Sequence, residues 1–278
     1  MNKLNLEKRV LILKLLVKGM SIADTADVVG VSPNTVAKLL EDVGAECSVY
    51  LHFNMVKLPC IRIQVDELWS FVKMKEKRVL FYPKPVGLGD VYTWVALCPD
   101  TKLVPCYHVG RRDAEHAHQF MDDLAWRFKE RIQLTSDGHQ PYLEAVETAF
   151  GGAVDYAMMI KHYGGYRVLR DGRRKKCRPS ECSGTSKRVI CGNPDPAHIS
   201  TSLVERQNRT MRMGMRRFTR ETDAFSKKFQ NHKAAVALHF MHYNFVRQHK
   251  SLHGATPAMA AGLAKSFWKF EDIVRLVD

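Results

Sequence analysis

The chain has 278 residues, of which 45% are hydrophobic and 26% charged, as in a globular protein with a sizeable core and one or two domains. Its balance of 43 Lys and Arg against 29 Asp and Glu gives a net charge of +14 and favours a polyanionic partner, either nucleic acid or an anionic membrane. A membrane is disfavoured because Lys14 and Lys18 interrupt the N-terminal apolar stretch, and no apolar run approaches about 18 residues. No secretory signal is evident, so we expect a cytoplasmic protein with seven reduced cysteines.

The positive charge is concentrated in two segments. Residues 161–188 contain ten Lys and Arg and two acids, and residues 205–233 contain nine and three. These two segments account for the whole net charge. A surface that only keeps a protein in solution would mix its charges more evenly, so we interpret both segments as nucleic-acid contacts, with a solubilising face as the alternative.

Residues 1–46 have the pattern of a helix-turn-helix domain. Helical spacing over 7–19 is followed by a turn at Gly30 and by Ser32, which reads as an N-cap before Pro33. Because residues 1–50 hold six basic and six acidic side chains, a helical packing or dimerisation module is the alternative to DNA recognition. The exposed candidates for base contacts on the last helix are Asn34, Thr35 and Lys38.

The remaining sequence predicts an α/β core and a helical C-terminal segment. Residues 47–60 read as a linker, residues 61–222 as the core and residues 223–278 as a helical segment. Within the core we expect strands at 61–68, 91–98, 102–109, 132–136 and 154–160, and helices at 113–129, 140–149 and 200–220. Residues 161–198 are rich in Gly, Pro, Arg and Lys and predict a long basic loop, which is more often functional than scaffolding.

Three carboxylates stand where metal-dependent chemistry on DNA would need them. Asp66 interrupts a strand pattern, Asp137 ends another, and Glu205 begins a very basic helix. An Asp-Gly pair at 137 could be only a turn, but an unpaired charge inside an apolar strand is costly. Hard oxygen ligands suit Mg²⁺ or Mn²⁺, and two such ions can activate a water or a DNA 3′-hydroxyl and stabilise the leaving oxygen.

The helix predicted at 200–220 would carry a row of arginines on the same face as Glu205. At about 100° per residue, that face holds Arg209, Arg212, Arg216 and Arg220. The alternative is a solvated helix with i,i+4 ion pairs, which would interleave more acids than this one does. Without a bound anion the arginines would repel one another, so we interpret them as phosphate contacts.

The order strand-Asp66, strand-Asp137, helix-Glu205 resembles the catalytic triad of DDE transposases and integrases, and Arg212 stands where those enzymes often place a basic residue. Several segments are similar to transposases of the bacterial insertion-sequence-one type. They are ISTSLVERQN at 199–208, RRFTR at 216–220, AFSKK at 224–228, YNFVRQHK at 243–250 and TPAM at 256–259.

The resemblance implies a ribonuclease-H-like catalytic core behind a helix-turn-helix domain. It also implies Asp66, Asp137 and Glu205 as ligands of Mg²⁺ or Mn²⁺, and cleavage and strand transfer of element ends. The implied partners are double-stranded DNA, as element ends and target, and further copies of the chain on that DNA. Two rivals are a catalytically silent helix-turn-helix regulator derived from such an element and a ribonuclease acting on hybrids.

Three cysteines of the basic loop could in principle bind zinc. Cys177, Cys182 and Cys191 are separated by four and eight residues, with His198 downstream. This spacing fits no familiar zinc motif, and no CxxC pair is present, so we favour free thiols.

Overall fold

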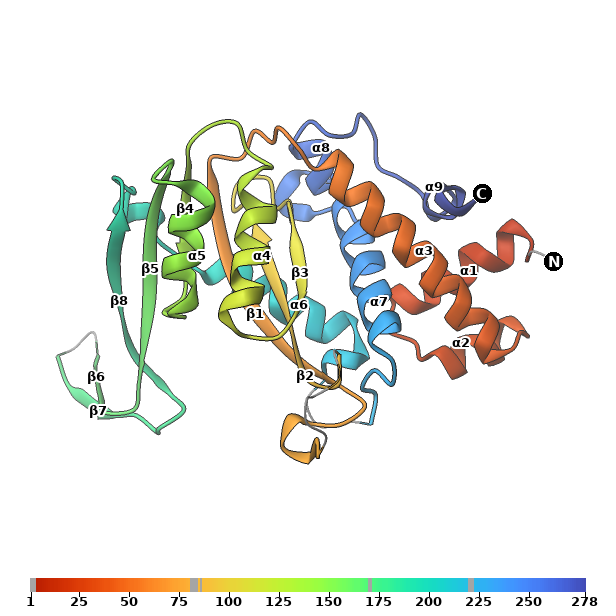
Figure 1. Cartoon of the computed structure of the whole chain (residues 1–278), viewed down its shortest axis with the longest axis horizontal. Coiled ribbons are helices and arrows are strands. Elements are labelled where there is room, and N and C mark those ends of the chain that lie inside the picture. The colour runs from red at the N-terminus through yellow and green to blue at the C-terminus, as the bar shows by residue number, and fades with distance from the viewer. Residues whose placement is uncertain (1–3, 81–84, 86, 170–171, 220–222) are drawn as a thin grey trace.

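The structure, a computed structural model, describes residues 4–80, 85, 87–169, 172–219 and 223–278. It begins with three helices, α1 (Leu6–Val17), α2 (Ile22–Val29) and α3 (Pro33–Asn54) (Figure 1). Ser21 and Ser32 cap α2 and α3 by accepting a backbone hydrogen bond three residues on, and Gly30 ends α2 with φ 68°. The helix-turn-helix prediction is confirmed at the level of structure.

Helix α3 is longer than the sequence pattern predicts. It continues to Asn54, so a linker beginning at residue 47 is wrong: residues 47–54 are helical, and Cys47 and Leu51 are buried. The cause is tertiary packing of α3 against α7 (Phe229–Met241). At their crossing a Cβ on Gly44 would lie 2.5 Å from Ala234, so only glycine permits this approach.

A six-stranded mixed sheet forms the centre of the molecule, which confirms the α/β prediction. Its order is β3-β2-β1-β4-β5-β8, with β4 and β5 parallel to β1 and the other neighbours antiparallel. The strands are β1 (Arg62–Val72), β2 (Gly89–Leu97), β3 (Tyr107–Gly110), β4 (Ile132–Ser136), β5 (Val154–Tyr163) and β8 (Cys182–Cys191).

Helices cover both faces of this sheet (Figure 1). Trp94 of β2 packs with Phe120 and Tyr142 of α4 (Ala114–Ala125) and α5 (Pro141–Phe150) on one face. Helix α6 (Ser202–Gly214) lies on the opposite face against β1 and β2. The core is therefore a three-layer arrangement with β1 at its centre.

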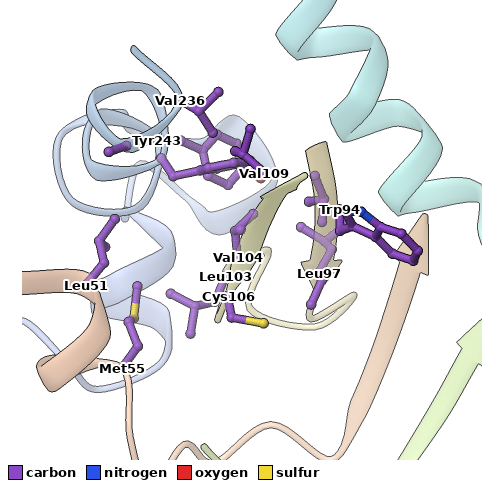
Figure 2. Packing of buried hydrophobic residues seen from close by; sticks show 14 of the residues in the cluster. Leu51, Met55, Trp94, Leu97, Leu103, Val104, Cys106, Val109, Val236 and Tyr243 are labelled. Carbon is purple, nitrogen blue, oxygen red and sulfur yellow. The ribbon is translucent and has the colours of Figure 1, made fainter. Parts of the chain in front are cut away.

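Helices α1 and α3 share one hydrophobic core with the sheet, whereas Ala26 and Val29 of α2 pack with Ile12 and Val36 in a second, smaller cluster. Figure 2 shows Leu51 of α3 and Met55 just after it, with Val236 and Tyr243 from the α7 side, packed around the β2–β3 connection. A π-helical turn at His242–Val246 follows α7, and the short helices α8 (Pro257–Ala260) and α9 (Phe270–Val274) complete the chain. Helix α9 packs against α1, so the C-terminal segment braces the helix-turn-helix.

Two further predictions are corrected. Residues 161–198 are not a long loop: they contain the end of β5, the hairpin strands β6 (Tyr166–Val168) and β7 (Arg174–Lys176), and all of β8. These strands are mostly exposed, so they lack the alternation of apolar residues that marks a half-buried strand. Helix α6 ends at Gly214 rather than near residue 220, because Met215 turns to extended backbone and Phe218 enters the core.

In the part of the chain that the structure describes, no helix combines the length and the apolar character that crossing a bilayer requires.

Candidate active site

The sheet register brings the first two predicted carboxylates together. Strand β1 pairs with β4 in parallel, with Gln64 opposite Thr135. Continuing this register by two residues sets Asp66 beside Asp137, which directly follows the last residue of β4. Residues at matched positions of adjacent paired strands lie side by side, so Asp66, in the interior of β1, and Asp137, just after β4, are neighbours by topology.

Gln64 helps to place the third carboxylate beside these two. Its side-chain oxygen accepts hydrogen bonds from the backbone N–H groups of Leu203 and Val204, at 3.0 and 3.2 Å. These are among the four N-terminal donors of α6 that lack a partner within the helix, and the N-cap residue Thr201 makes no side-chain cap bond. The start of α6 is thereby fixed to β1, and Glu205 lines the same pocket as Asp66 and Asp137.

Asp66 and Glu205 are each held by polar neighbours. Asn208, one turn after Glu205, donates from Nδ2 to Asp66 Oδ2 at 2.9 Å. The two oxygens of Glu205 contact Thr201 Oγ1 and Lys161 Nζ, both at 2.5 Å. The pocket therefore holds its acidic side chains in fixed positions, and an ammonium group already lies against Glu205.

Charge crowding perturbs these groups. Burial, together with the nearby Asp137 charge, raises the pKa of Asp66 to about 6, although the Asn208 hydrogen bond opposes the shift. Burial is the largest single influence on Lys161 and by itself lowers its pKa, but the hydrogen bond to Glu205 and the nearby Glu205 and Asp66 charges together hold the pKa of the ammonium above its usual value. A site that raises carboxylate pKa values in this way gains from a bound cation.

Glu67 is a fourth acid at the site, which the sequence reading missed. Its side chain is 2% exposed, and Arg112 Nε donates to Oε2 at 3.0 Å. Burial and the Asp137 charge raise the pKa of Glu67 to about 7. Arg112 also lies 3.7 Å from Asp137, so one guanidinium links two of the acids.

The donor set fits a hard divalent cation. Among the described residues, Asp66, Glu67 and Asp137 form the one group of acidic, His or Cys side chains with ligand atoms all within 4.8 Å of one another. Carboxylate oxygens are the ligands that Mg²⁺ and Mn²⁺ prefer. Glu205 lines the pocket beside this group and is engaged with Lys161 and Thr201.

Of the predicted arginines on α6, one reaches the pocket. Arg212 lines it with Glu205 and Asn208, on one face of the helix. Arg209 is exposed outside the pocket. Arg216 follows the end of α6 in a 3₁₀ turn, so it does not continue that face, and Arg220 lies outside the described residues. The predicted continuous row is wrong because α6 stops at Gly214.

The predicted base-contacting residues lie at the first turns of α3. Asn34 is exposed and lines a groove between α3 and residues 223–228. Thr35 Oγ1 lies 2.9 Å from Ser32 Oγ, so this hydroxyl takes part in the helix cap. Lys38 is exposed and pairs with Asp42 at 2.9 Å. Asn34 and Lys38 are thus the two of the three whose polar groups face solvent.

The three loop cysteines do not form a shared site. Cys182 and Cys191 are the two ends of the ten-residue strand β8. At about 3.3 Å per residue these ends are roughly 30 Å apart, too far for one zinc ion. Cys177 directly follows β7 and is buried, and its sulfur lies 3.9 Å from the Lys175 carbonyl oxygen. We therefore interpret all three as free thiols.

Sequence signals existed for some of the missed residues. Asn208 stands three residues after Glu205, the spacing of helix neighbours. Gln64 and Asp66 are two apart on one strand and so share a face. Lys161 had no signal, because its approach to Glu205 depends on where β5 and α6 lie relative to each other.

Comparisons with known proteins identify the N-terminal helices. A family model described as a homeodomain-like domain matches residues 3–45, which cover α1, α2 and the start of α3. No curated protein matches the chain.

Several solved transposase structures are similar to the chain. One is a piggyBac transposase synaptic complex with hairpin DNA, at 10% identity and a TM-score of 0.45 over 99% of this chain and 71% of that one. Two others are the Mos1 strand transfer complex and a Mos1 paired-end complex with the left transposon end. These have 16% and 14% identity, TM-scores of 0.24, and alignments over 56% of this chain. They cover 59% and 60% of the Mos1 chains, so this chain spans about three fifths of their length.

Proposed function

We propose that this chain is a DDE-type DNA transposase that cleaves and joins insertion-sequence ends with Mg²⁺ or Mn²⁺. The observation that carries the proposal is the convergence of Asp66, Asp137 and Glu205, from two parallel strands and a helix, on one pocket. Pure DNA recognition has no need of such a pocket. The mixed sheet, with helices on both faces, supports the ribonuclease-H-like core that the resemblance implies.

In this proposal the residues of the pocket have distinct roles. Asp66, Asp137 and Glu205 would hold the metal ions, with Glu67 close enough to contribute an oxygen. The bound ions would supply activation of a water or a 3′-hydroxyl and stabilisation of the leaving oxygen. Asn208 orients Asp66, and Lys161, which lies beside Glu205, is placed to contact a phosphate oxygen of the reacting strand.

The remaining surface would bind double-stranded DNA. The homeodomain-like helices supply the expected reading of element ends through Asn34 and Lys38. Arg209 and Arg216 are exposed beyond the pocket and suit phosphate contacts. Assembly of several copies on DNA belongs to the same proposal.

The test is metal-dependent joining of labelled element-end DNA by the purified chain. Asp66→Asn and Glu205→Gln should each reduce joining by about 1,000-fold or more, since metal stabilisation of the reacting oxygens contributes several kcal/mol. DNA binding should remain. Glu144→Gln, an exposed acid on α5 outside the pocket, is the control and should leave joining unchanged. Joining that survives Glu205→Gln would contradict the proposal, and binding without any joining by the unaltered chain would favour the silent regulator.

A further inference from the structure

The ribbon made by β5 and β8 extends into a small hairpin. After Tyr163 the chain passes through Gly164 and Gly165, with φ values of 69° and 66°, and then forms β6 and β7 (Figure 1). Non-glycine residues rarely adopt this left-handed conformation, so the two glycines set the bend between ribbon and hairpin. The backbone bond from Cys177 N to Gly165 O, at 2.9 Å, extends the β6–β7 ladder, and the bond from Gly164 N to Glu181 O, at 3.0 Å, extends the β5–β8 ribbon.

The two faces of this hairpin differ in charge. Arg167 pairs with Lys175 across the strands, and both lie 3.8 Å from the Glu181 carboxylate. Successive strand residues point to opposite faces, so the Tyr166–Lys176 and Val168–Arg174 pairs belong to the other face. Among the described residues, no acid forms an ion pair with Arg174 or Lys176. This second face therefore carries two cations beside the exposed side chains of Tyr166 and Val168.

An aromatic ring is the centre of that second face. Tyr166 is 58% exposed, and the Arg174 guanidinium lies 5.3 Å from its ring centroid. A solvent-exposed ring flanked by cations is the combination by which proteins hold unpaired nucleotides, because bases stack on the ring while the cations contact the backbone. Duplex DNA keeps its bases stacked inside and offers no such face.

A second exposed tyrosine links the hairpin to the acidic pocket. Tyr163 is 59% exposed and lines the pocket with Asp66 and Glu205. It follows Lys161 by two residues on β5, so both side chains lie on the same side of that strand. The route from the pocket to Tyr166 is therefore short and bears aromatic and cationic groups.

We propose that Tyr163 and Tyr166 form a stacking site for unpaired nucleotides of the DNA strand whose phosphate lies in the acidic pocket. This rests on the proposed function and deepens it, because it assigns a frayed or single-stranded flank, rather than intact duplex, as the ligand beside the reacting bond. Arg174 and Lys176 hold the backbone of that flank.

The experiment measures binding of the full chain, in buffer with chelator and without divalent metal, to element-end DNA with either a blunt end or a short unpaired flank. The flank carries a fluorescent base analogue whose emission falls on stacking. Tyr163→Leu and Tyr166→Leu should each weaken binding of the flanked DNA by about 5- to 100-fold, the range for one stacked base, and restore the emission. Tyr163→Phe and Tyr166→Phe keep the ring and should behave as the unaltered chain. Phe53→Leu, which replaces another exposed aromatic ring, on α3, is the control and should change neither the binding nor the emission.

The charge on the hairpin has a matched pair of variants. Lys176→Gln lies on the face of Tyr166 and should lower the salt dependence of flanked-DNA binding by about 0.7 in the log–log slope, whereas Lys175→Gln, on the Glu181 face, should not. Equal loss of blunt and flanked binding in the leucine variants, or no loss of either, would overturn the proposal. Because no metal is present, these results do not depend on joining activity, so failure of the stacking site and failure of the proposed function are separable.

Discussion

The acidic pocket and the exposed basic surfaces around it are built in opposite ways. In the pocket, Asp66 and Glu205 are held by hydrogen bonds and an ion pair from neighbouring elements. Outside it, Arg209, Arg216 and Lys176 are exposed. Buried charge is costly unless partnered, whereas exposed charge is solvated and needs no partner. Substitutions in the pocket should therefore have large, coupled effects, and substitutions outside it small, additive ones.

Apart from the carboxylates proposed to hold metal, the largest effect is expected at Gln64, because this one side chain links β1 to α6. Gln64→Leu removes the acceptor for the Leu203 and Val204 N–H groups and frees the start of α6. Misplacing Glu205 by about 1 Å would cost roughly 100-fold in joining, and the unpaired donors about 1–3 kcal/mol of stability. Joining rates and urea unfolding measure the two effects.

Gln133→Leu is the matched control for this prediction. Gln133 also makes two backbone hydrogen bonds, but to Asp195 rather than to α6. The Gln133→Leu variant should be less stable than the unaltered chain but should not lose joining activity to a comparable degree. If both variants reduce joining equally, Gln64 has no special role in placing Glu205.

The next largest effect is expected on the free energy of unfolding, from the cost of keeping several acids close together in the pocket. The folded-state pKa of Glu67, about 7, lies above its ordinary 4.5. Its contribution to stability is therefore fully present below pH 4.5 and is lost as the pH rises through 7. The Glu67→Gln variant cannot ionise at this position and does not lose that stability. Its free energy of unfolding should therefore exceed that of the unaltered chain by about 3 kcal/mol at pH 8 and by little at pH 4.5.

Urea unfolding of both proteins between pH 4.5 and pH 8 checks whether their stability difference grows with pH as expected. Mg²⁺ at pH 8 should narrow the difference, because an ion bound among the acids stabilises the unaltered chain. A difference between the two proteins that does not change with pH would mean that Glu67 is not the group that titrates.

A smaller effect is expected at the first turns of α3, where the proposed base contacts lie. Removing residues 1–45 would cut α3, whose second half is buried against α7, so point substitutions test this surface better. Asn34→Ala should lower the preference for element ends over random duplex by about tenfold, the value of one good base contact. Competition binding measures it, and Glu41→Gln on the same helix is the control. An unchanged preference would place sequence reading elsewhere.

The smallest effect concerns exposed arginines. Arg209→Gln combined with Arg216→Gln should weaken binding of all duplexes alike and lower the log–log salt slope by about 0.9 for each phosphate that the variant no longer binds. Because the two residues do not share a helix face, their effects should add. Affinities measured across a range of salt concentrations test this. An unchanged slope would show that these side chains are only solvated.

The sequence by itself determined the features that depend on neighbours along the chain. Ser32, Pro33 and Gly30 signal the helix-turn-helix because caps and turns are local. Alternation of apolar residues predicts β1 and β4, and with them the strand positions of Asp66 and Asp137. The charge of residues 161–188 was visible in composition alone.

The tertiary structure decided where elements end and which side chains meet. Helix α3 runs to Asn54 because α7 buries its second half, and α6 stops at Gly214 because Phe218 is drawn into the core. Lys161 meets Glu205 only because β5 and α6 are neighbours in space. The exposed strands of residues 161–198 form by backbone pairing between distant segments, which leaves no periodic pattern in their side chains. Such contacts join residues far apart in the chain, and no local signal encodes them.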